Sequence, residues 1–138
     1  MSLNYAKHGL GFLVLGSALL SPSVEARKLG ELDFQACSLQ MPNSSMTVSA
    51  QCSKLKVPEN PAQPKGRQIE LAIAWIPAKG EAQPDPVFML AGGPGQSALE
   101  AYPQLHNAFT DVIKKRNIIL VDQRGTGKSN PLICKEQA

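Results

Sequence analysis

Apolar and polar residues alternate along two stretches in the first half of the chain. Residues 46–57 (MTVSAQCSKLKV) alternate loosely, and residues 68–76 (QIELAIAWI) alternate cleanly. A period of two is typical of strands with one buried and one wetter face. Because a proline-rich loop follows each stretch, we expect a pair of antiparallel edge strands here. Residues 27–45 are too weakly patterned to predict an element.

The pattern changes in the second half of the chain. Residues 87–90 (VFML) and 117–121 (NIILV) are short, fully apolar runs, which are typical of buried strands. Between them, apolar residues recur at spacings of three and four from about residue 96 to 116, which predicts a helix broken or kinked at Pro103. The predicted fold class is therefore α/β, with antiparallel entry strands followed by a βαβ unit whose two strands are parallel.

The first residues have the pattern of a secretory signal peptide. A short positive start precedes residues 9–20 (GLGFLVLGSALL), an apolar run too short to span a bilayer comfortably. Small residues stand one and three positions before a cut after Ala26. We expect residues 1–26 to be removed and residues 27–138 to be the N-terminal portion of a truncated domain, secreted or periplasmic, with no membrane partner after cleavage. The alternative is an uncleaved membrane anchor.

The composition is that of a globular protein, with 43% hydrophobic and 18% charged residues. The net charge of +3 is spread thinly, and no aromatic residue alternates with basic residues as base stacking requires. We therefore expect no nucleic-acid partner.

Export makes the three cysteines candidates for disulfides, because disulfides persist in oxidising compartments. Cys37 and Cys52 flank a short polar loop that a disulfide between them would close. Cys134 is then left over, and a partner for it beyond Ala138 is one explanation. No two cysteines have metal-ligand spacing and the chain has only two histidines, so no metal or cofactor is expected.

A glycine-rich turn follows the first apolar run. Residues 90–95 (LAGGPG) let the backbone turn sharply and leave its N–H groups uncovered. Uncovered N–H groups at the carboxyl end of a parallel strand can hold an anion or a developing oxyanion. A plain strand-to-helix turn is the alternative.

A second motif, residues 122–129 (DQRGTGKS), follows the other apolar run. Its last three residues resemble a phosphate-binding loop, but that motif needs a glycine where this chain has Asp122, whose carboxylate would repel phosphate. No nucleotide partner is therefore expected. We predict instead that Asp122 and Arg124 form a partly buried ion pair that fixes the loop, while Gly125 and Gly127 permit its bends.

Gly92-Gly93-Pro94-Gly95 followed by Asp122-Gln123-Arg124-Gly125-Thr126-Gly127-Lys128-Ser129 resembles the proline iminopeptidase and tripeptidyl aminopeptidase group of α/β-hydrolases. With the segments beside the motifs, the resemblance to the secreted members covers about residues 52–134. It implies the N-terminal part of an α/β-hydrolase fold and a serine exopeptidase that removes residues from peptide N-termini. It also implies that a backbone N–H of Gly92 or Gly93 contributes to the oxyanion hole. Many relatives have histidine or asparagine where this chain has Ala91.

The remaining parts of such an active site do not occur in this sequence. No G-x-S-x-G nucleophile motif is present. Ser97 lies past the glycine turn, and His106 falls on the predicted helix, where we expect a surface or packing role. The chain is therefore expected to be a fragment or truncated product of an exported aminopeptidase, acting on peptide substrates only in the full-length enzyme and inactive as given. The alternative is a non-catalytic secreted binding or structural module, which stable cooperative unfolding of residues 27–138 alone would favour.

Overall fold

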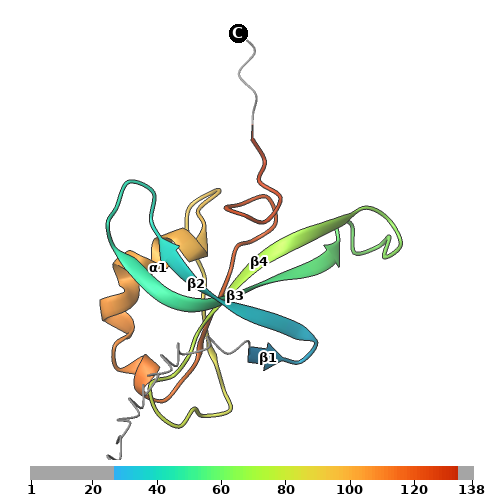
Figure 1. Ribbon diagram of the computed structural model, residues 1–138. Coiled ribbons are helices and arrows are strands. Elements are labelled where there is room, and N and C mark those ends of the chain that lie inside the picture. The colour runs from blue at the N-terminus through green and yellow to red at the C-terminus, as the bar shows by residue number, and fades with distance from the viewer. Residues whose placement is uncertain (1–26, 134–138) are drawn as a thin grey trace, which may run out of the picture.

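The computed structural model describes residues 27–133, so the predicted signal peptide and Cys134 lie outside the described residues. The described part of the chain folds around one six-stranded sheet of order β1-β2-β3-β4-β6-β5 (Figure 1). The strands are β1 (Arg27–Leu29), β2 (Leu32–Gln40), β3 (Thr47–Pro58), β4 (Gln68–Ile76), β5 (Val87–Met89) and β6 (Ile118–Val121). The helical elements are α1 (Ala98–Leu105) and two 3-10 turns, η1 (His106–Phe109) and η2 (Val112–Lys114).

The sheet is mixed. β1 to β4 are successive antiparallel neighbours, β6 lies antiparallel to β4, and β5 lies parallel to β6. The predicted antiparallel pair and the predicted parallel pair joined by a helix are therefore both confirmed. The prediction that the two alternating stretches lie at an edge was wrong, because β2 pairs with β3 on one side and β6 pairs with β4 on the other.

β2 lies in the segment for which no element was predicted. Its buried residues are Phe34 and Leu39, which belong to separate apolar clusters. Residues five positions apart on a strand face opposite sides, so β2 buries one residue on each face of the sheet. A strand of this kind shows no alternation, which is why the pattern did not reveal it.

The predicted helix is shorter than its apolar spacing indicated. α1 ends at Leu105, two residues after Pro103, and the rest of the predicted segment forms η1 and η2. Pro103 lacks the amide that would bond the carbonyl of Leu99, which weakens the last turn of the helix. α1 still packs on the sheet through its buried residues, among which Tyr102 is completely buried.

The two parallel strands differ in their burial. Ile118, Ile119 and Leu120 of β6 are buried, as predicted. β5 is an edge strand, and its Phe88 side chain is 60% exposed, so the prediction of a fully buried strand was wrong for β5. The carboxyl ends of both strands meet at the same edge of the sheet, and the two glycine-containing motifs start there.

Candidate functional site

The glycine turn joins β5 to α1 and has an open backbone. Gly93 and Gly95 have φ angles of +76° and +84°, a conformation that side chains disfavour. Gly92, Gly93, Pro94 and Gly95 are all exposed. A β-carbon added at any of the three glycines would meet no atom within 4 Å. The geometry therefore leaves room for a group to approach the backbone of the turn.

Asp122 follows β6 directly and is completely buried. Its Oδ1 accepts hydrogen bonds from the Ser97 hydroxyl (2.7 Å) and from the backbone amide of Leu99 (3.2 Å). Its Oδ2 accepts a hydrogen bond from the backbone amide of Lys128 (3.0 Å). Both carboxylate oxygens are therefore satisfied, as a buried acceptor requires.

The predicted ion pair between Asp122 and Arg124 was wrong. Arg124 is exposed, and among the described residues no salt bridge involves it. The physical reason is that a hydroxyl and two backbone amides already give both oxygens of the buried Asp122 a partner, while Arg124 lies on the solvent side of the loop. Gln123 is exposed as well.

The loop 122–129 bends at its two glycines, as predicted. Gly125 and Gly127 have φ angles of +80° and +47°. Hydrogen bonds within the loop stabilise this path, from the Gly125 amide to the Ser129 carbonyl (2.8 Å) and from the Ser129 amide to the Thr126 carbonyl (2.8 Å).

Ser129 is a buried residue of this loop for which the sequence pattern predicted no separate role. Its hydroxyl accepts a hydrogen bond from the backbone amide of Ala72 on β4 (2.8 Å). The carbonyl of the same Ala72 accepts a hydrogen bond from the amide of Asp122 (3.0 Å). Both ends of the loop are therefore attached to one residue of β4. The only sequence signal was a small polar residue at the end of the motif.

His106 has the packing role that the sequence indicated, and Ser97 has a structural role that the sequence did not indicate. Ser97 is buried and caps α1, because its Oγ accepts a hydrogen bond from the Glu100 amide (3.1 Å). His106 is half-buried, with its Nδ1 3.1 Å from the Tyr102 hydroxyl. Burial raises the pKa of Tyr102 to about 12. His106 is thus a packing residue.

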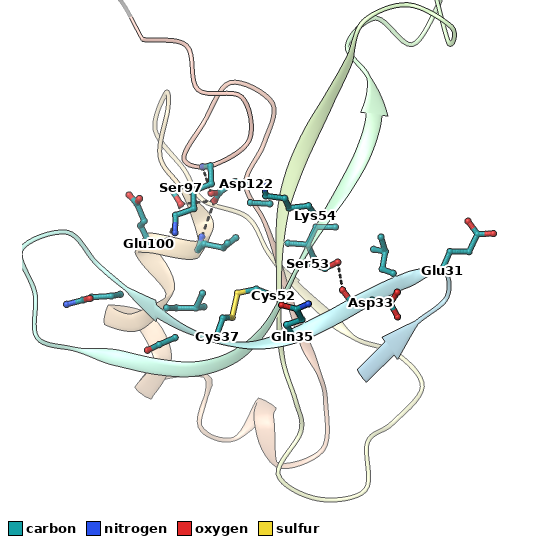
Figure 2. A pocket seen from close by; sticks show the side chains of 18 residues that line it. Glu31, Asp33, Gln35, Cys37, Cys52, Ser53, Lys54, Ser97, Glu100 and Asp122 are labelled. Carbon is teal, nitrogen blue, oxygen red and sulfur yellow. Dashed lines mark hydrogen bonds between the residues drawn. A yellow bond between two sulfur atoms is a disulfide. The ribbon is translucent and has the colours of Figure 1, made fainter. Parts of the chain in front are cut away.

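A groove of about 680 Å³ opens beside Asp122, between the start of α1 and strands β2 and β3 (Figure 2). Cys37 and Cys52 form a disulfide, which confirms them as a pair. Both cysteines line the groove. Leu39, Ala72 and Leu99 supply apolar surface, and charged residues from several elements also line it, namely Glu31, Asp33, Lys54, Glu100 and Lys128.

Within residues 27–133 no group of histidine, cysteine or acidic residues is arranged to hold a metal ion. No helix in that range is long and apolar enough to span a bilayer.

Several curated proteins are similar to this chain. Carboxylesterase B of Mycobacterium tuberculosis is 30% identical over 108 residues, covering 76% of this chain and 21% of that protein. Serine protease Hip1 of the same organism is 30% identical over 114 residues, covering 80% of this chain and 22% of that protein. Tripeptidyl aminopeptidase of Streptomyces lividans is 28% identical over 108 residues, covering 75% of this chain and 20% of that protein.

These relatives confirm the resemblance that the two motifs indicated, since their names are consistent with an α/β-hydrolase-like serine peptidase family. The mixed sheet is compatible with that class of fold. The chain spans about a fifth of the length of these curated relatives. No protein-family model matches the chain.

Proposed function

We propose that this chain is the N-terminal portion of an exported serine hydrolase of the α/β-hydrolase fold, an aminopeptidase that acts on peptide N-termini. The observation that carries the proposal is the open glycine turn at the carboxyl end of β5, next to the parallel strand β6. The similarity to a serine protease and a tripeptidyl aminopeptidase supports the assignment to peptide hydrolysis.

The contribution of this chain is electrostatic. Hydrolysis of a peptide bond places negative charge on the carbonyl oxygen in the transition state, and preorganised backbone N–H groups stabilise that charge. Gly92 or Gly93 would donate one such hydrogen bond, since both residues are exposed and no atom lies within 4 Å of their β-carbon positions. The nucleophile, its acid and its histidine would come from residues outside this sequence, so the chain alone is inactive.

The location proposed is outside the cytoplasm. The disulfide between Cys37 and Cys52 fits an oxidising compartment. The first 26 residues, with their short positive start and apolar run, supply the signal for export.

Expression of the chain followed by N-terminal sequencing of the exported product tests the proposed export. We expect the product to start at Arg27, and L13R, which interrupts the apolar run, to abolish export. Retention of residues 1–26 on the exported protein would contradict it.

The hydrolase assignment is tested by sequencing the gene beyond the codon for Ala138 and expressing the complete open frame. We expect a G-x-S-x-G serine in the added part, labelled by a fluorophosphonate probe, and release of p-nitroaniline from peptide p-nitroanilides with a free N-terminus. The 1–138 chain is the control and should remain unlabelled. Cleavage of p-nitrophenyl esters but not of the peptides would replace the aminopeptidase assignment with an esterase. A stop codon after Ala138 would overturn the enzyme assignment.

A further inference from the structure

The glycine turn is held by its ends rather than by its own hydrogen bonds. Within the turn, the described backbone hydrogen bonds include a single long one, from the Gln96 amide to the Gly93 carbonyl (3.4 Å). No side chain packs against the positions where β-carbons would lie. A chain containing three glycines has many accessible backbone conformations. Its placement therefore depends on buried Met89 and half-buried Ala91 before the glycines, which pack in the main apolar cluster, and on buried Ser97 after them.

Ser97 ties the second end of the turn to Asp122. The Ser97 hydroxyl donates to Asp122 Oδ1, and the same oxygen accepts from the amide of Leu99 in the first turn of α1. Asp122 is itself fixed on its other sides, by its own amide bonded to the Ala72 carbonyl and by the Lys128 amide bonded to Oδ2. The carboxylate thus links the end of the glycine turn to the interior of the sheet.

We propose that Asp122 is a positioning residue for the oxyanion-binding turn and that it acts through Ser97. This inference rests on the proposed function, because oxyanion binding is the reason why the turn must be held in position. Backbone donors that stabilise a transition state must be held within about 0.5 Å of the productive position. A turn with little internal bonding meets that demand only if a neighbouring group restrains it, and the buried Asp122 carboxylate is that group.

The chemistry of the carboxylate suits this role. Its two oxygens accept from three donors, whereas an asparagine in the same space would have one oxygen and one NH₂ group. In an asparagine variant, either the Lys128 amide or the pair formed by Ser97 and Leu99 would face a donor instead of an acceptor. D122N should therefore release one side of the link with almost no change in volume.

The test is NMR relaxation of the glycine amides in the complete gene product, labelled with ¹⁵N-glycine. In wild type we expect Gly92, Gly93 and Gly95 to have order parameters near the rigid value of about 0.85. In S97A we expect these order parameters to fall below about 0.6. In D122N we expect a smaller fall, because the asparagine can keep the bond from Ser97 by turning its NH₂ group toward the Lys128 amide. S97T keeps a hydroxyl and should restore the wild-type values.

S129A is the matched control, because it removes a buried hydrogen bond to the same residue of β4 without touching Ser97 or Asp122. It should lower the free energy of unfolding and leave the turn glycines rigid. Unchanged order parameters in both S97A and D122N, or an equal loss in S129A, would overturn the positioning role. The measurement needs no enzymatic activity, so failure of the hydrolase assignment would be detected separately, by the labelling and peptide assays on the complete gene product.

Discussion

Gly127 lies directly against the buried carboxylate of Asp122. An added β-carbon at Gly127 would overlap Asp122 Oδ2 and would lie 2.7 Å from Asp122 Cγ and 2.8 Å from Ser97 Cβ. A β-carbon does not approach other heavy atoms this closely, so any side chain at position 127 must displace the carboxylate or the serine. The second glycine of the loop is therefore required both by its φ angle of +47° and by space.

We predict that G127A lowers the free energy of unfolding by about 2–4 kcal/mol, because it combines a left-handed backbone with a displaced buried carboxylate. Urea unfolding followed by circular dichroism measures the loss. G30A is the control, since Gly30 has a φ angle of +60° but nothing within 4 Å of its β-carbon position. That variant should lose only about 1–2 kcal/mol. Equal losses in the two variants would show that the contact with Asp122 is unimportant.

S129A should destabilise the fold by about 1–3 kcal/mol, because it leaves the buried amide of Ala72 without its acceptor. The comparison is S53A, whose hydroxyl makes an exposed hydrogen bond to the Asp33 carbonyl and whose removal should change stability by less than about 0.5 kcal/mol. Denaturant midpoints of the two variants report the difference. A loss in S129A no larger than in S53A would mean that water replaces the serine hydroxyl.

The disulfide between Cys37 and Cys52 joins β2 to β3 across a sequence separation of 15. Closing a loop of this length stabilises a fold by about 3 kcal/mol, mainly by restricting the unfolded chain. We predict that the C37S/C52S double variant loses about this amount, and that reductant lowers the melting temperature of wild type but leaves that of the double variant unchanged. If reductant lowered the melting temperature of both proteins equally, the drop would not come from reduction of the Cys37–Cys52 disulfide.

Tyr102 should make the fold sensitive to alkaline pH. Burial favours the neutral phenol and raises the pKa of Tyr102 from its usual value of 10 to about 12. The stabilisation is therefore complete below pH 10 and is lost as the pH rises through about 12. Urea midpoints of wild type and Y102F between pH 8 and 12 test this. The wild-type midpoint should fall toward that of Y102F over the upper part of this range, whereas parallel curves would contradict the prediction.

The strands that were predicted from the sequence are those with one dominant pattern. Apolar and polar residues alternate along β3 and β4, and β6 is apolar throughout. The residues of each of these strands therefore suffice to predict that it is a strand. Those of β2 do not, because Phe34 and Leu39 are buried on opposite faces. Whether a strand lies at an edge or inside the sheet depends on its neighbours, which explains why β3 and β4 were placed at an edge.

The candidate site was predicted as two motifs but not as a network. The sequence identified Asp122 as a residue that fixes its loop, and it suggested Arg124 as partner because that is the nearest opposite charge. The actual donors are the amides of Leu99 and Lys128 and the hydroxyl of Ser97. Every residue except proline has a backbone amide, so no residue type indicates such a partner.

The attachment of the 122–129 loop at Ala72 has a consequence for how this protein can change during evolution. Both hydrogen bonds use the main chain of Ala72, one through its amide and one through its carbonyl. The bonds themselves therefore accept any residue at position 72 except proline, which has no N–H. Selection to retain this attachment would act on Ser129 and on the course of β4, and an alignment of relatives would show little trace of it at position 72.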